Sequence, residues 1–169
     1  MTARQPLASD PIELARENWI THGWADAADG MAFVTSIMRV QQAYLAQIEG
    51  LLRPSRLTFA RFEVLRLLAF SRRGALPVGK VGERLQVHPA SVTNAVQRLE
   101  ADGLVVRRTN PGDRRSILAE ITPAGRRLVA ECTQTLNTDV FTKVPISRAE
   151  QREASAALTH IRKAFGDFK

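Results

Sequence analysis

Apolar residues recur every three or four positions through most of this chain, which is the period of amphipathic helices. Together with local start and stop signals, the pattern predicts seven helices. We expect six of these helices over about residues 10–21, 27–52, 58–71, 88–102, 122–144 and 147–165. The fourth in chain order is a brief helix of about two turns marked by Val81 and Leu85. The apolar stripe of the sixth helix should contain Leu128, Cys132, Leu136 and Val140, and that of the second should contain Val34, Met38, Leu45, Ile48 and Leu52.

Several helix ends are marked by residues that satisfy free backbone groups. Asp10–Pro11 and Thr122–Pro123 each place a side-chain acceptor at the N-cap and proline at the first helical position. Ser147 and Glu150 have the spacing of a capping box. Gly103 stands where a glycine that ends a helix is expected. These signals support the first, fifth, sixth and seventh helices independently of the apolar pattern.

Two segments between the fifth and sixth helices have the pattern of β-strands. Leu104 to Thr109 predicts one strand, and residues 115–121 alternate as a returning strand. Turn-forming residues at 110–113 join the two strands, and residues 76–78 could form a very short third strand. A short helix, a tight turn, a second helix and a hairpin in this order are typical of a winged helix-turn-helix.

Charge is unevenly distributed along the 169 residues. The net charge is +7, and residues 53–115 alone carry thirteen basic and five acidic side chains, whereas residues 1–30 carry a net charge of −3. A basic middle suggests a polyanionic partner, of which nucleic acid is the commonest. Charge alone does not decide this, because many basic domains bind no nucleic acid.

Composition excludes several other classes of protein. A hydrophobic fraction of 44% is ample for a packed core, so we do not expect a chain that is disordered along its whole length. No apolar run reaches the length of a membrane span and no secretory signal is recognisable, so we expect a cytoplasmic protein without a membrane partner. His22, His88 and His160 are scattered and Cys132 is the only cysteine, so we expect no metal and no other cofactor. No catalytic triad or phosphate-binding loop is present, and we expect no enzymatic activity.

The helix that begins at His88–Pro89 has the two faces that a DNA-recognition helix needs. Its apolar residues Val92, Val96 and Leu99 share one side at 100° per residue. Asn and Gln can pair with adenine, an Ala methyl can touch thymine, and Ser, Thr and Arg suit phosphates. The predicted base-reading residues are Ala90, Asn94 and Gln97, and the predicted phosphate-binding residues are Ser91, Thr93 and Arg98. An ordinary amphipathic surface helix is the alternative interpretation of this pattern.

The tip of the predicted hairpin carries Arg114 and Arg115. Arginines at the end of an extended hairpin suit insertion into a narrow, electronegative minor groove. Taken alone, the same residues would also fit a solvated charged turn.

Residues 58–128 resemble the multiple-antibiotic-resistance-regulator (MarR) family of transcription factors. Residues 58–68 are similar to the helix that precedes the reading head in that family. The segments 91–93, 98–100 and 102–107 match its recognition helix and first wing strand. The wing signature of the family is matched by Asp113, Arg114, Arg115, Ile121, Thr122 and Gly125. The departures are His88–Pro89 in place of a Ser-like cap, and Ile121 in place of Leu.

The resemblance implies a homodimer whose N- and C-terminal helices interlock, with a small-molecule pocket between these helices and the reading head. It implies that Arg115 enters the minor groove and that Asp113 braces it. The apolar stripes on the first, second, sixth and seventh helices also exceed what a small reading head could cover, which favours pairing across a two-fold axis. A helix at 10–21 resembles the extra N-terminal helix of some family members.

Two groups of residues admit a functional and a structural interpretation. Trp19, His22 and Trp24 could line an effector pocket, although anchoring of the first helix is the simpler role. Cys132 could sense oxidants, but its place in an apolar stripe favours a buried structural thiol.

The expected fold class is mainly α with a small β-hairpin wing (α+β), in which a winged helix-turn-helix reading head is embedded in an all-helical dimerisation region. We expect a flexible tail, N-terminal dimerisation helices, a DNA-binding domain and C-terminal dimerisation helices at 1–9, 10–55, 56–122 and 123–169. The leading hypothesis is a homodimeric regulator, in the role of a repressor, that binds double-stranded DNA at a near-palindromic operator and is released by a small-molecule effector such as an aromatic acid. The alternative is a winged-helix module that binds proteins and not DNA.

Overall fold

The computed structural model of the protein describes residues 7–169, apart from the side chain of Arg114. The chain forms two compact units, one that ends at Gln47 and one that runs from Ile48 to Lys169. Of the predicted flexible tail at 1–9, positions 1–6 lie outside the described residues. The finer division at 10–55, 56–122 and 123–169 remains a prediction.

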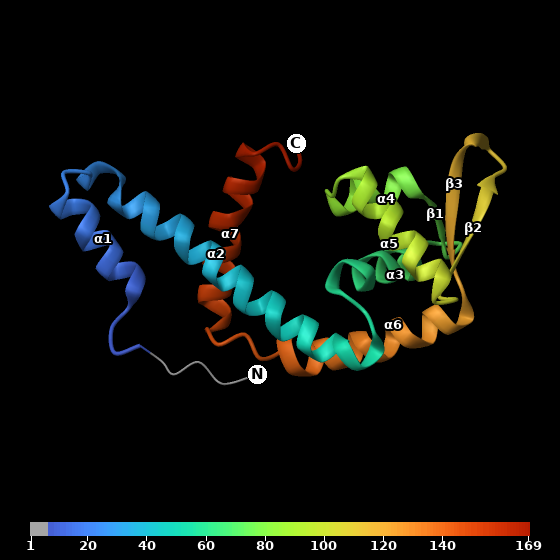
Figure 1. The fold of residues 1–169 in the computed structure, drawn as a ribbon, viewed down its shortest axis with the longest axis horizontal. Coiled ribbons are helices and arrows are strands. Elements are labelled where there is room, and N and C mark those ends of the chain that lie inside the picture. Colours follow the sequence, from blue (N-terminus) through green and yellow to red (C-terminus); the bar gives the residue numbers. More distant parts are fainter. Residues whose placement is uncertain (1–6) are drawn as a thin grey trace. The chain divides into compact units, whose positions relative to one another are not determined.

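The elements follow the predicted order of helices, a reading head with a small sheet, and further helices (Figure 1). The α-helices are α1 (Pro11–Thr21), α2 (Ala25–Leu52), α3 (Phe59–Phe70), α4 (Val78–Leu85), α5 (Pro89–Ala101), α6 (Pro123–Leu136) and α7 (Arg148–Ala164). The strands are β1 (Ala75–Pro77), β2 (Val105–Asn110) and β3 (Asp113–Ile121). A 3-10 turn, η1 (Arg53–Ser55), follows α2, and a π-helical turn, η2 (Asn137–Phe141), follows α6.

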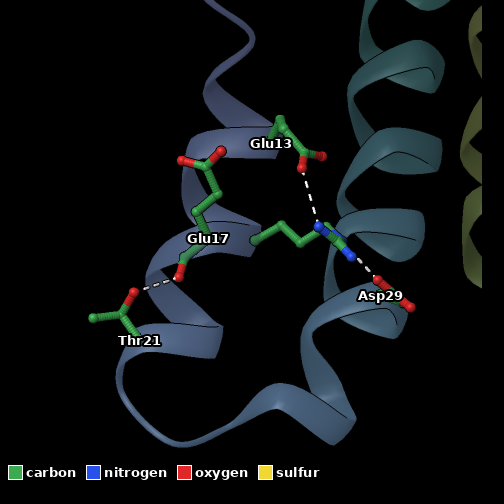
Figure 2. Close-up of polar contacts among 5 residues, drawn as sticks. Glu13, Glu17, Thr21 and Asp29 are labelled. Atoms are coloured by element: carbon green, nitrogen blue, oxygen red, sulfur yellow. Dashed lines mark hydrogen bonds and ion pairs between the residues drawn. The ribbon is translucent and has the colours of Figure 1, made fainter.

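The first unit contains α1 and most of α2. Asp10 caps α1 as predicted, because its Oδ1 accepts a hydrogen bond from the Ile12 N–H at 2.8 Å. Arg16 joins the two helices, since its Nε donates to Asp29 Oδ1 at 2.6 Å and its Nη1 donates to Glu13 Oε1 at 3.1 Å (Figure 2). These carboxylates raise the pKa of Arg16.

The second unit has its core where α3, α5 and α6 meet the sheet. The side chains that are almost fully buried there belong to Leu52, Val64, Leu65, Leu68, Val81, Val92, Val96, Leu99, Val105, Val129 and Leu136. Val92, Val96 and Leu99 are among them, so the predicted apolar side of α5 is confirmed.

The sheet has three antiparallel strands in the order β1-β3-β2. The predicted hairpin is confirmed, and β1 extends it by pairing Ala75 with Glu120 and Pro77 with Leu118. The returning strand begins at Asp113 rather than at residue 115, and the short first strand is shifted by one residue because Val78 already belongs to α4.

Helix α6 differs from its prediction in two ways. Val129 is fully buried and Leu128 only partly, because Gly125 packs against the turn before the sheet and directs the face 125, 129, 132, 136 inward. The α-helix ends at Leu136, and a π-helical turn carries the chain to Phe141, where the prediction had one continuous helix.

The apolar stripe of α7 is largely uncovered within the chain. Leu158 is 41% exposed, Ile161 is half-buried, and Phe165 lies just beyond the end of the helix with 88% of its surface exposed. The capping box that starts this helix is confirmed, with Ser147 N–H donating to Glu150 Oε2 at 2.8 Å and Glu150 N–H donating to Ser147 Oγ at 3.2 Å. These contacts lower the pKa of Glu150.

The start of α6 is hydrogen-bonded to the turn that follows α5. Thr122 Oγ1 donates to the Gly103 carbonyl at 2.9 Å and accepts the Gly125 N–H at 3.0 Å, while the Thr122 N–H donates to the Leu104 carbonyl at 3.0 Å. A Cβ at Gly125 would collide with that carbonyl oxygen of Leu104. The sheet and α6 are therefore joined by backbone packing that only glycine allows.

Candidate nucleic-acid interface

A three-residue turn separates the two helices of the reading head. Helix α4 ends at Leu85, Gln86 adopts a left-handed conformation with φ of 53°, and α5 begins at Pro89. Short turns of this kind hold the helices of a helix-turn-helix at a fixed crossing. The buried side of α5 fixes its rotation, so its opposite side is presented to solvent.

His88 caps the recognition helix. Its ring Nδ1 accepts a hydrogen bond from the Ala90 N–H at 3.2 Å, which is the task that Ser or Thr usually performs at an N-cap. The departure from the Ser-like pattern therefore leaves a capped helix that begins at the expected proline.

The six residues predicted to contact DNA from α5 are all exposed: Ala90, Asn94, Gln97, Ser91, Thr93 and Arg98. The structure thus brings them together on one accessible surface. The hydroxyl of Thr93 donates to the Pro89 carbonyl at 2.9 Å, so in this conformation only its oxygen lone pairs are available to a ligand.

The two acids of this helix lie at its far end and are engaged by arginines. Glu100 Oε1 accepts the backbone N–H of Arg107 at 3.2 Å, and Glu100 Oε2 accepts the Nε of the same residue. These bonds lower the pKa of Glu100. Arg61 Nη1 lies 3.2 Å from Asp102 Oδ2. Negative charge is consequently both distant from the exposed reading surface and compensated.

The pairing between β2 and β3 is irregular at the positions of Arg114 and Arg115. Thr109 pairs with Ile117, but the next residue, Asn110, pairs with Asp113, so residues 114–116 have no partner on β2. Irregularities of this type bend a strand and redirect its side chains. Asn110 Nδ2 donates to Ser116 Oγ at 2.8 Å, and Ser116 Oγ donates to the Asp113 carbonyl at 3.0 Å. Asn110 and Ser116 therefore fix the tip.

Asp113 contacts Arg115 through the main chain. Its Oδ1 accepts the Arg115 N–H at 3.0 Å, which positions the backbone and leaves the exposed guanidinium of Arg115 without an ion pair to any described residue. The side chain of Arg114, the other predicted wing arginine, lies outside the described residues. By contrast, Arg108 pairs with Glu120 at 2.9 Å, so it is less available to a phosphate.

Trp19, His22 and Trp24 form one aromatic cluster in the first unit. The two indole rings meet edge to face with centroids 5.4 Å apart, and the His22 ring stacks on Trp24 at 5.9 Å. Trp24 is 55% exposed and His22 Nδ1 lies 2.7 Å from the Asn18 carbonyl. The structure confirms that the three side chains are neighbours, whereas a ligand-binding role for them stays a prediction.

Sequence reasoning missed two ionisable groups on α3. Arg66 places its guanidinium carbon 4.2 Å from the centroid of Phe70 and donates from Nη1 to Thr133 Oγ1 at 3.2 Å, while its buried Nε has no partner among the described residues. Burial raises the pKa of Glu63 on the same helix. Neither residue belongs to a recognisable motif, so only the packing of α3 reveals them.

Other chemistry has little support in the part of the chain that the structure describes. No three His, Cys, Asp or Glu side chains there gather as a metal site would require. Cys132 is buried with 3% of its surface exposed, which matches its predicted structural place. No helix formed by residues 7–169 has the length and hydropathy to cross a membrane.

Known proteins share both this sequence pattern and this fold. A model of the MarR family matches residues 57–116. A crystal structure of Sco5413, a MarR family transcriptional regulator from Streptomyces coelicolor, is 47% identical to the chain, covers 83% of it and 98% of the relative, and superposes with a TM-score of 0.76. The chain belongs to the MarR family. The predicted family and the predicted mainly α fold with a small β wing are thus confirmed.

Other members of the MarR family and related regulators extend the comparison. The transcriptional repressor MdtR of Bacillus subtilis is 37% identical over 59 residues, which are 35% of this chain and 38% of MdtR. The chain therefore matches about two fifths of that curated relative. A mutant of MarR from E. coli, solved in complex with operator DNA, has the same fold at 22% identity, with a TM-score of 0.73 over 80% of this chain and 96% of that one.

Proposed function

We propose that this MarR family member is a homodimer that binds double-stranded DNA at a near-palindromic operator and represses transcription there. The observation that carries the proposal is the exposed surface of α5 that contains Asn94 and Gln97. The acidic side chains lie at the other end of this helix and are paired with arginines. DNA as the ligand is supported by the structure of E. coli MarR in complex with operator DNA. Repression is supported by the similarity to MdtR, a transcriptional repressor.

In this proposal α5 and the wing contact different parts of the DNA. Ala90, Asn94 and Gln97 read base edges in the major groove, and Ser91, Thr93 and Arg98 bind phosphates. Arg115 enters the minor groove from the wing, with Arg114 beside it in sequence and Asp113 fixing the backbone. Two such heads in a two-fold dimer would contact half-sites centred about 10 base pairs apart.

Uncovered apolar surface supports the homodimer. Phe33, Val34, Met38 and Val40 on α2 are each about half exposed, and the stripe of α7 is also open. Patches of this kind are uncommon on monomers and mark sites of association. Light scattering after size exclusion at micromolar concentration should give about twice 18.7 kDa. A monomer would contradict the proposal.

The test of DNA binding is an electrophoretic shift with selected genomic fragments and with random duplex, each at two salt concentrations. A regulator should shift both, the fragments more tightly, and the affinity should fall with salt. If neither duplex shifts, the alternative of a winged-helix module that binds protein partners would be favoured.

An effector and the cellular location complete the proposal. The aromatic cluster of Trp19, His22 and Trp24 binds a small aromatic acid that releases the DNA, which a titration of tryptophan fluorescence can follow because Trp19 and Trp24 are the only two tryptophans. An effector response that is unchanged in Trp19→Phe would count against this site. The protein acts in the cytoplasm and has no enzymatic activity, as expected for a regulator of this family.

A further inference from the structure

The guanidinium of Arg61, on α3, forms hydrogen bonds with three separate parts of the reading head. Its Nη2 donates to the Arg56 carbonyl at 2.6 Å, in the corner between η1 and α3. Its Nε donates to Thr58 Oγ1 at 3.4 Å, which belongs to the N-cap of α3. Its Nη1 donates to Asp102 Oδ2 at 3.2 Å, at the end of α5. This last contact joins two residues that are 41 positions apart, so it links α3 directly to the recognition helix.

The pair of Arg61 and Asp102 differs from an ordinary surface ion pair. Only 20% of the Arg61 side chain is exposed, whereas fully exposed pairs contribute little because water and salt screen them. Asp102 is the C-cap of α5, and a carboxylate is unfavourable there because the carbonyl end of a helix is already partly negative. The positive charge of Arg61 offsets this repulsion. The pair therefore stabilises the end of α5 in its contact with α3.

The corner that Arg61 holds has an unusual backbone. Arg56 has a left-handed conformation with φ of 54°, which is unfavourable for a residue with a side chain. The bond from Arg61 to the Arg56 carbonyl supports this conformation. One guanidinium thus contacts both the corner that follows η1 and the end of the recognition helix.

The end of α5 determines how its exposed surface is presented. The buried side of the helix fixes its rotation, and its far end is held by Arg61 at Asp102 and by the Thr122 hydroxyl, which donates to the Gly103 carbonyl at 2.9 Å. Base contacts from side chains such as Asn94 require a geometry that is correct to a fraction of an ångström. A change at the far end of α5 would therefore alter base contacts while leaving the surface charge of the exposed side unchanged.

We propose that Arg61 is a positioning residue for operator recognition, which fixes the end of α5 and thereby the placement of Asn94 and Gln97 without itself contacting DNA. The inference rests on the proposed DNA-binding function and adds to it a residue outside the reading surface. Arg61 and Asp102 act as a unit in this role, because the removal of either partner removes the same link.

A double-mutant cycle on DNA affinity tests the proposal. Arg61→Gln, Asp102→Asn and the double variant are titrated with a duplex selected from genomic fragments by the unsubstituted protein, and with random duplex. Each single variant should weaken binding to the selected duplex about threefold to tenfold, and the double variant should lose no more than the weaker single variant, because the link is lost only once. Binding to random duplex and the salt slope should stay unchanged, because no phosphate contact is removed.

Two further variants sharpen the comparison. Arg61→Lys keeps the charge and should lose less than Arg61→Gln. Arg162→Gln is the matched control, since it breaks an ion pair with Asp167 beyond the end of α7 and should change neither affinity.

Several outcomes of the cycle would overturn the positioning role. They are unchanged affinity in Arg61→Gln, additive losses in the double variant, and a smaller salt slope in Arg61→Gln, which would make Arg61 a phosphate contact. Opposite effects of Arg61→Gln and Asp102→Asn on both duplexes would also overturn it, because they would reveal a long-range effect of charge.

Amide hydrogen exchange of the full chain without DNA separates this inference from the proposed function. Residues 89–103 should exchange faster in Arg61→Gln and in Asp102→Asn, while residues 148–164 should be unchanged. If the unsubstituted protein binds selected and random duplexes equally, the proposed function fails, and the exchange alone decides whether Arg61 holds α5. Unchanged exchange at 89–103 refutes the positioning role. An equal increase in both segments also refutes it, because it would indicate a general loss of stability.

Discussion

The carboxylate of Glu100, in the last turn of α5, accepts hydrogen bonds from both the backbone N–H and the Nε of Arg107 in β2. One residue pair thus connects the end of the recognition helix to the first strand of the wing. The connection depends on the ionised carboxylate, because a protonated acid would lose its attraction to the guanidinium.

Glu100→Gln should lower the melting temperature at neutral pH, and the difference from the unchanged protein should shrink in acid. The pKa of Glu100 in the folded chain is below its ordinary value of 4.5, so the pair stabilises the fold above that pH. The contribution is lost as the pH falls from 4.5 through the lower folded pKa. Thermal melts between pH 7 and pH 3.5 measure this, with Glu131→Gln as the exposed control. A difference that stays constant with pH would show that the pair is not the cause.

Asn94→Ala should weaken binding to the operator by about 1–3 kcal/mol and have little effect on random duplex, because base readout is lost and phosphate contacts remain. Gln134→Ala, exposed on α6, should change neither affinity. Fluorescence anisotropy with both duplexes measures the two affinities. Equal losses on operator and random duplex would remove Asn94 from base readout.

Arg115→Ala should weaken binding to operator and random duplex alike and reduce the salt slope by about one unit, because one cation leaves the interface. Asp113→Ala should act in the same direction but more mildly, since Asp113 holds only the backbone of Arg115. Affinities at four salt concentrations give the slope. Arg72→Ala, exposed before β1, is the control. An unchanged slope in Arg115→Ala would place this arginine outside the DNA contact.

Gly125→Ala should destabilise the protein by about 1–3 kcal/mol, because the added methyl group must displace the Leu104 backbone. Gly79→Ala in α4 should be neutral or stabilising by up to about 1 kcal/mol, since no atom lies within 4 Å of the added carbon. Chemical denaturation of both variants at one protein concentration makes the comparison. Equal stability of the two variants would mean that the backbone contact at Gly125 is not needed.

The features that the sequence predicted are those determined by neighbouring residues. Asp10, Thr122 and Ser147 each accept a hydrogen bond from the first turn of their helix, so the cap can be recognised from a few residues. The buried side of α5 likewise follows from helical periodicity. The strand pattern likewise predicted the hairpin with Arg115 near its tip, which the structure confirms. The family resemblance added the roles of Arg115 and Asp113, and the contact of Arg115 with DNA stays a prediction.

The features that the sequence missed depend on contacts between distant segments. The irregular register at residues 114–116 requires Asn110 to reach Ser116 across the hairpin, and periodicity gives no sign of this. Val129, and not the predicted Leu128, lies in the core, because the contact between Gly125 and the backbone of Leu104 fixes the rotation of α6. The π-helical turn η2 after α6 was also missed, because the apolar pattern of α6 contained no signal for it.

Strand β3 runs into α6 with only Thr122 between them, and Thr122 is itself bonded to the turn after α5. The wing and α6 are consequently joined closely at Thr122 and at the contact between Gly125 and Leu104. A molecule that displaces α6 would therefore move the wing, and with it Arg115, without touching the reading surface.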